Sequence, residues 1–281
     1  MTTPREKISQ HYTVTDLGNQ ILAALKSAGK DPERLAVDDL APVDEFHIRG
    51  RMATEELARW ADVRKGDVLL DVGCGLGGTG RYLATTAGCD VVGIDLTEEY
   101  CRVAEMLSAR VGLAARTTFR QGSALALPFR DAHFDVVWTE HVQMNIDDKK
   151  GFYGELNRVL KPGGKLAFHD IFAGSREGLQ FPVPWAANAS INHLVAPDEV
   201  RRLLTELGLE EVRWEDKTDA SYASFEALLE RVRTEGWMPV GLHLLMGSDA
   251  ETKFKNMLGN LEEDHVRVVQ AVMKRKEEHH V

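Results

Sequence analysis

Between residues 66 and 171, short apolar segments alternate with amphipathic helical segments, and this alternation is the strongest constraint on how the chain can fold. The apolar segments have strand length, and the sequence predicts strands at Val68–Val72, Val91–Asp95, Thr117–Gln121, Phe134–Trp138 and Lys165–Asp170. Helices are expected at Thr79–Thr86, Glu98–Val111 and Lys149–Leu160. Strands alternating with helices predict a doubly wound, mostly parallel α/β sheet.

The segments before and after this core predict helices and two further strands. Before it, helices are expected at Asp16–Ala28 and Met52–Ala61, joined by a loop rich in Asp and Pro over residues 30–46. After it, we expect an irregular insertion at about 171–196, a helix at Pro197–Leu207, a strand at Glu210–Asp216 and mostly helix over 220–262. The tail Val266–Met273 fits a helix or a strand, and its β-branched residues favour a strand.

The predicted organisation is an N-terminal helical lid over residues 1–62, followed by one domain over residues 63–281. This domain carries insertions at about 171–196 and 220–262, of which the first is expected to be irregular and to cap the site and the second to be mostly helical.

Composition excludes several classes of protein. The 34 Lys and Arg are outnumbered by 44 Asp and Glu, and the resulting net charge of -10 disfavours binding to nucleic acid or to an anionic membrane. No apolar run approaches the roughly 20 residues of a membrane span, and the N-terminus lacks a signal-peptide pattern. The three cysteines, Cys74, Cys89 and Cys101, form no metal or disulfide motif. We expect a cytoplasmic protein that holds no metal.

A glycine-rich turn follows the first predicted strand, in the sequence Asp71-Val72-Gly73-Cys74-Gly75-Leu76-Gly77-Gly78. Gly73 and Gly75 lack a Cβ, so the backbone can fold tightly and approach a ligand closely. N–H groups at the following helix start can receive a carboxylate or a phosphate. Gly73, Gly75 and Gly78 also match G-x-G-x-x-G, so a dinucleotide site and an ordinary tight turn are both alternatives.

Two acidic residues favour a cationic nucleoside ligand over a dinucleotide. Asp71 lies at the end of the strand, where its charge would repel a pyrophosphate but suit the ammonium and sulfonium groups of S-adenosylmethionine. Asp95 ends the next strand, twenty residues after Gly75, and is placed to accept hydrogen bonds from ribose hydroxyls.

These motifs resemble the class I S-adenosylmethionine-dependent methyltransferases. Asp-Val-Gly-Cys-Gly-x-Gly-Gly and the following Val-Val-Gly-Ile-Asp resemble the family's first two strand ends. Phe134–Trp138 and the segment 158–164 resemble its fourth strand and the loop before its fifth. The resemblance implies a seven-stranded sheet in which Glu210–Asp216 and Val266–Met273 form the final pair.

Within this family, the chain is most similar to the glycine, sarcosine and dimethylglycine N-methyltransferase group and its small-molecule relatives, through His11-Tyr12 and Phe46-His47-x-Arg49-Gly50. That similarity implies methyl transfer from S-adenosylmethionine to a small-molecule amine, with S-adenosylhomocysteine as product. Methyl transfer to O, S or C, an NAD(P)-dependent oxidoreductase and a non-catalytic nucleotide-binding protein are the alternatives. A homodimer stays open.

The resemblance also implies which residues bind the cofactor: Asp71, Gly73, Gly75, Gly77, Asp95, Leu96, Ser123, Ala124 and His141. Ser123 stands where many members carry an Asp, and a neutral hydroxyl accepts a hydrogen bond from the adenine amino group more weakly. The Asn/Asp-Pro-Pro-Tyr motif of nucleobase and glutamine methyltransferases is absent after the fourth strand.

The catalytic candidates are His141, Asn145 and Tyr12. His141 follows the fourth strand on the rim that carries Gly73, and imidazole can accept a proton at neutral pH. Asn145 is expected to orient the substrate, and Tyr12 to shield the sulfonium. Further candidates, each with structural packing as its alternative, are His11, Arg51, Cys74, His169, Trp185 and His193.

Overall fold

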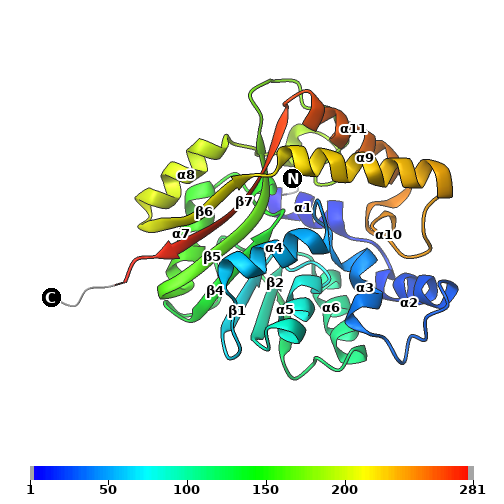
Figure 1. Cartoon of the computed structure of the whole chain (residues 1–281), viewed down its shortest axis with the longest axis horizontal. Coiled ribbons are helices and arrows are strands. Elements are labelled where there is room, and N and C mark those ends of the chain that lie inside the picture. The colour runs from blue at the N-terminus through cyan, green and yellow to red at the C-terminus, as the bar shows by residue number, and fades with distance from the viewer. Residues whose placement is uncertain (1–2, 278–281) are drawn as a thin grey trace.

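The computed structural model describes residues 3–277 and contains one seven-stranded sheet (Figure 1). Its strands are β1 Val68–Val72, β2 Asp90–Asp95, β3 Thr117–Gln121, β4 Phe134–Glu140, β5 Leu160–Ala173, β6 Leu209–Asp216 and β7 Val266–Arg275. Their order across the sheet is β3-β2-β1-β4-β5-β7-β6. β1 to β5 pair in parallel, whereas β7 runs antiparallel to both β5 and β6. The predicted doubly wound sheet and its final strand pair are therefore confirmed.

The α-helices of the described residues are α1 Pro4–Tyr12, α2 Leu17–Ser27, α3 Val37–Asp44, α4 Arg51–Ala61, α5 Gly78–Thr86, α6 Glu98–Arg110, α7 Lys149–Val159, α8 Pro197–Glu206, α9 Thr218–Glu235, α10 His243–Met246 and α11 Ala250–Glu262. Short 3-10 turns occur at Gln143–Asn145, Ala189–Ile191 and Gly247–Asp249.

Two of these helices differ from the expectations. The segment predicted as a loop contains α3, because Asp38 and Asp39 occupy its first turn and Leu40 and Val43 are buried. The side chain of Asp39 also accepts a hydrogen bond from the Ala36 N–H at 2.8 Å. Helix α1 was not predicted either. It begins with reciprocal hydrogen bonds between Thr3 and Glu6.

Both faces of the sheet are covered by helices. One core cluster joins Leu57 of α4 and Leu83 of α5 to the sheet, and a second joins Phe152 of α7 and Val200 of α8 to the opposite face. The tail Val266–Met273 belongs to strand β7, as its β-branched residues predicted. This strand pairs on both sides and is buried over most of its length. No helix within residues 3–277 is both long enough and apolar enough to cross a membrane.

α1, α9 and α11 lie beyond the carboxyl ends of the parallel strands, whereas α6 packs against β2 and β3. α9 and α11 belong to the connection between β6 and β7, and they lie beside α1 in Figure 1. An apolar cluster joins Ile8 of α1, Phe225 of α9 and Phe254 of α11 to Trp185 and Met144 below them. This cluster therefore covers the edge of the sheet where loops follow β4 and β5.

Candidate active site

A cavity of about 790 Å³ opens between the carboxyl ends of the strands and the helices above them. Its sheet side is formed by residues after β1, β2, β3 and β4, and its upper side by α1, α9, α11 and the segment 236–243. The volume lies in the upper part of the range of about 300–1,000 Å³ that is usual for small-molecule sites. The cavity is therefore of a size that is usual for binding small molecules.

The two glycines at the start of the turn differ in what requires them. Gly73 has φ +75°, and a Cβ there would lie 2.2 Å from Val142 Cγ2, so packing against the loop after β4 excludes a side chain. Gly75 has φ +51°, lines the cavity, and has nothing within 4 Å of the position of a Cβ. Gly73 thus closes the floor of the site, whereas Gly75 leaves space where a ligand can approach the backbone.

Gly77 and Asp71 lie behind the surface of the main cavity. A Cβ on Gly77 would lie 2.5 Å from Phe119 Cζ, so this glycine packs against the core. Asp71 is 3% exposed and lines a smaller adjoining chamber of about 40 Å³ with Glu140 and Tyr100. Asp71 Oδ2, Glu140 Oε1 and the Tyr100 hydroxyl are all buried without a hydrogen-bond partner. The chamber therefore presents unsatisfied acceptors beside the glycine turn.

Asp95 is fixed by two backbone groups. Its Oδ2 accepts from the Gly75 N–H at 3.0 Å, and its Oδ1 accepts from the Thr97 N–H at 2.8 Å. Burial raises the pKa of this carboxyl, and the two N–H groups oppose that rise. Leu96, Ser123 and Ala124 continue the same wall of the cavity. The structure thus brings the predicted ribose and adenine residues to one side of the site.

His141 lines the cavity and has a left-handed backbone with φ +54°. Its Nε2 accepts from the Ile48 N–H at 3.5 Å, while His169 Nε2 donates to the Ile48 carbonyl at 3.0 Å. Burial lowers the pKa of His141 well below its usual value, and the neighbouring His169 and His47 lower it further. The imidazole of His141 is therefore neutral at neutral pH and can accept a proton.

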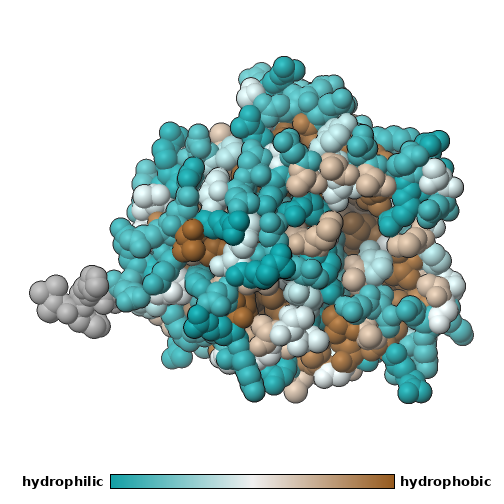
Figure 2. Space-filling model, viewed as in Figure 1, coloured by the Kyte–Doolittle hydropathy of each residue, from teal (hydrophilic) through white to brown (hydrophobic). Residues whose placement is uncertain are grey.

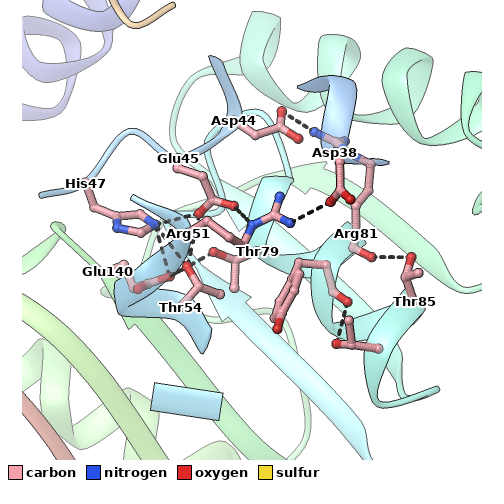
Figure 3. Close-up of polar contacts among 12 residues, drawn as sticks. Asp38, Asp44, Glu45, His47, Arg51, Thr54, Thr79, Arg81, Thr85 and Glu140 are labelled. Atoms are coloured by element: carbon pink, nitrogen blue, oxygen red, sulfur yellow. Dashed lines mark hydrogen bonds and ion pairs between the residues drawn. The ribbon is translucent and has the colours of Figure 1, made fainter. Parts of the chain in front are cut away.

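A buried network of charges lies beside His141, and the sequence reading did not identify it (Figure 3). His47 Nε2 lies 2.9 Å from Glu45 Oε2 and 3.5 Å from Glu140 Oε2. Burial alone would lower the pKa of His47, but the charge of Glu140 and the hydrogen bond and charge of Glu45 raise it to about 9. His47 is therefore a buried cation that joins the segment after α3 to the end of β4.

Hydroxyl and indole groups complete this network. Glu140 Oε2 accepts from Thr79 at 2.8 Å and from the Trp138 indole at 2.9 Å, and Thr54 donates to Glu45 at 3.0 Å. Arg51, a candidate for a ligand carboxylate, instead contacts Glu45 through Nε at 2.5 Å. The sequence shows Glu45 two residues before His47 and Glu140 directly before His141, but it does not show that these two segments meet.

Tyr12 and Asn145 both line the cavity and hydrogen-bond to each other. The Tyr12 hydroxyl donates to Asn145 Oδ1 at 2.8 Å, and Asn145 Nδ2 donates to the carbonyls of Trp185 and Ile191 at 3.0 and 2.9 Å. Burial, followed by the charges of neighbouring groups, raises the pKa of Tyr12 well above its usual value. Tyr12 thus keeps its proton, and Asn145 ties α1 to the segment after β5.

The other candidates fall into two groups. Trp185 and His193 line the cavity. His11 contacts the Pro184 carbonyl through Nε2 at 2.9 Å, His169 is fully buried, and Cys74 lies in the floor of the small chamber. The arrangement as a whole places the neutral imidazole of His141 and the protonated Tyr12 on the lining of one cavity.

Comparison with known proteins agrees with this geometry. Residues 70–168 match the model of a methyltransferase domain. The chain is 32% identical over 197 residues to 27-O-demethylrifamycin SV methyltransferase of Amycolatopsis mediterranei, a match that covers 69% of this chain and 71% of that one. It is 29% identical over 189 residues to glycine/sarcosine/dimethylglycine N-methyltransferase of Actinopolyspora halophila, covering 67% of this chain.

The first four curated relatives are matched over only 31% to 55% of their own length. Among solved structures, geranyl diphosphate C-methyltransferase of Streptomyces coelicolor superposes with a TM-score of 0.69 at 19% identity, covering 98% of both chains. At that identity the superposition shows a shared fold.

The pKa of His47 predicts how stability depends on pH. The folded protein binds the second imidazole proton of His47 more tightly than the unfolded chain does. The stabilisation of the folded state by this proton is therefore complete below about pH 6.5 and is lost as the pH rises towards about 9. We expect the urea-derived free energy of unfolding to fall across this window. His47→Gln is expected to lower that free energy by about 3–5 kcal/mol at neutral pH and to flatten the decline.

The matched control is His133→Gln, because His133 lies on a turn outside both cavities. It should retain the slope of the unmodified protein. An equal slope in His47→Gln and the unmodified protein would show that His47 is not the titrating cation.

Proposed function

The chain belongs to the S-adenosylmethionine-dependent methyltransferases, and we propose that it transfers the methyl group of S-adenosylmethionine to a small-molecule acceptor, leaving S-adenosylhomocysteine. The observation that carries this proposal is the continuity of the cavity, in which Gly75, Asp95 and the neutral His141 face the same space. The net charge of -10 supports a small molecule over a nucleic acid as the acceptor.

The residues of the sheet side fit this cofactor. Asp95 would accept hydrogen bonds from the ribose hydroxyls, and Leu96, Ser123 and Ala124 would contact the adenine. The unsatisfied acceptors of Asp71 and Glu140 suit a cationic ligand, because a positive charge nearby would lower the pKa values that burial raises. Gly77 supports the turn from the core side and is not part of this contact surface.

The chemistry asks the protein for alignment, exclusion of water and removal of one proton. S-adenosylmethionine supplies an electrophilic methyl group on a sulfonium. His141 would take the proton that the acceptor loses on Nε2, in exchange for its long contact of 3.5 Å with the Ile48 N–H, through an imidazole that its surroundings keep neutral. Tyr12 and Asn145 would close the cavity between α1 and the loop after β4, which keeps water from the reacting atoms.

A neutral base suits an acceptor that loses a proton when it is methylated, so an amine nitrogen or a hydroxyl oxygen is the proposed acceptor atom. The sequence favoured an amine such as that of sarcosine or dimethylglycine. The relatives named above are N-, O- and C-methyltransferases, so the atom must be identified by experiment. The acidic groups Asp71, Asp95 and Glu140 disfavour the diphosphate of NAD in the same space.

Two measurements test the function. Calorimetry should detect S-adenosylhomocysteine and give no signal with NAD. Incubation with methyl-labelled S-adenosylmethionine and a panel of amines, phenols and aliphatic alcohols, followed by mass spectrometry, should show transfer of the label to an acceptor. Cofactor binding without transfer to any compound class would favour a non-catalytic nucleotide-binding protein.

Gly75→Val should abolish cofactor binding, because the branched side chain would fill the open space beside the backbone. Gly29→Val is the matched control, since Gly29 has φ +77°, nothing within 4 Å of a Cβ and no contact with the cavity. Both variants should lose about 1–2 kcal/mol of stability from the left-handed backbone. Calorimetry with S-adenosylhomocysteine should separate them; equal affinities would refute the assignment of Gly75.

His141→Ala should lower kcat by about 10²–10⁴-fold if His141 is the base. His141→Gln retains a polar group near the Ile48 N–H but cannot take a proton at neutral pH, so it should be equally slow. Single-turnover rates and cofactor affinity should be measured for both variants, with affinity nearly unchanged. Recovery of most of the rate in His141→Gln would identify a positioning role instead, and full rates in both would remove His141 from the reaction.

A further inference from the structure

We propose that the acceptor is an amphiphile, with an apolar body in the upper half of the cavity and an anionic group at its rim beside Arg5 and Arg231. This inference rests on the proposed function and names its substrate class. It differs from the small zwitterionic amine that the sequence favoured.

The upper half of the cavity has apolar walls. They consist of side chains that also form one core cluster, namely Met144, Trp185, Phe225, Trp237, Phe254 and Met257. Trp185, Phe254 and Met257 are each no more than 2% exposed, so this part of the wall is held in place by packing. Figure 2 shows apolar surface in the recess between the positions of α9 and α3. Contact with such walls stabilises a bound apolar molecule, because it removes apolar surface from water.

Two polar side chains of this half, Asn145 and Trp185, are already engaged within the protein, whereas His243 Nδ1 is buried without a hydrogen-bond partner. Asn145 uses its amide on Tyr12 and on the carbonyls of Trp185 and Ile191, and the Trp185 indole donates to Asn192 at 2.8 Å. Asp147, an exposed residue, is the one carboxylate that this half contributes to the lining. A buried zwitterion would find few partners for its two charges, and burying charges without partners is costly.

Two helices lead from the buried wall towards exposed residues of the lining, and each carries an arginine there. On α1, Tyr12, Ile8 and Arg5 line the cavity at helical spacing, and exposure increases from Tyr12 to Arg5. On α9, Phe225 is buried, Leu228 is half-buried and Arg231 is exposed, again on the lining face. Arg231 follows Phe225 by six positions, which corresponds to about 9 Å along the helix axis.

Neither guanidinium has a side-chain partner in the part of the chain that the structure describes. By contrast, Arg233, two residues beyond Arg231, pairs with Glu230 at 2.6 Å on the outer face of α9. Two such arginines on the lining of one cavity, in a protein with a net charge of -10, mark a local site for an anion. The planar guanidinium binds both carboxylates and phosphates through paired hydrogen bonds.

The test measures binding to the full chain saturated with S-adenosylhomocysteine. Octanoate, octyl phosphate and octylamine carry the same apolar chain with different charges, and sarcosine serves as the small zwitterion. By calorimetry, the two octyl anions should bind about tenfold or more tightly than octylamine, and sarcosine should not bind. The ratio between octanoate and octyl phosphate distinguishes a carboxylate from a phosphate as the natural group.

Variants separate the two parts of the proposed ligand. Arg231→Gln should remove most of the preference for anions while chain binding persists, and Arg233→Gln on the same helix should leave it unchanged. Phe225→Ala should weaken all three octyl compounds by about tenfold or more, since a buried aromatic wall is lost. Unfolding midpoints confirm that each variant is folded.

The outcomes distinguish this inference from the proposed function. Methyl transfer to sarcosine, with no binding of the octyl compounds, would overturn the amphiphile and keep the methyltransferase. Binding of the octyl anions that depends on Arg231, without methyl transfer to any acceptor, would support the ligand class and remove the catalytic function. Equal binding of octyl anions and octylamine would overturn the anionic group.

Discussion

The site depends on a buried cation held between two carboxylates. Glu45 and His47 come from the segment after α3, whereas Glu140 ends β4, so the pairing joins parts of the chain that are almost a hundred residues apart. Taking these charges out of water is costly, and the pairing compensates for that cost only while the three groups keep their geometry. The segment that forms one wall of the cavity is therefore fixed to the sheet at the point where the loop after β4 begins.

The same network sets the charge of the groups around it. The positive His47 helps to keep His141 and His169 neutral, and these two histidines hold the backbone N–H and carbonyl of Ile48. On its other side, Glu140 contributes to the crowding of carboxyl groups near Asp71. The pairing of His47 with two carboxylates thus helps to keep the His141 imidazole neutral on one side and contributes to an electronegative chamber on the other.

The cavity combines a part set by the sheet with a part that belongs to this chain. The strand order reverses between β1 and its neighbour β4, and open α/β sheets bind their ligands at the carboxyl ends of the strands at such a point. The helices above it come from the N-terminus and from the connection between β6 and β7. A fold does not by itself fix function. The glycine turn therefore indicates the cofactor, whereas the choice of acceptor depends on the apolar residues of α9 and α11.

The sequence by itself determined the parts of the protein that depend on neighbours along the chain. Strand and helix periodicity predicted the sheet, and residue spacing placed Gly75 and Asp95 at adjoining strand ends, where a hydrogen bond now joins them. The loop that local composition predicted for residues 30–46 was wrong. These residues contain helix α3, which is stabilised by the burial of Leu40 and Val43 against distant partners. Only the tertiary structure brought Glu45, His47 and Glu140 together and directed the amide of Asn145 to Tyr12 and to the carbonyls of Trp185 and Ile191. The physical reason is that such contacts join residues far apart in the chain, and no spacing in the sequence encodes which distant charges share a buried space.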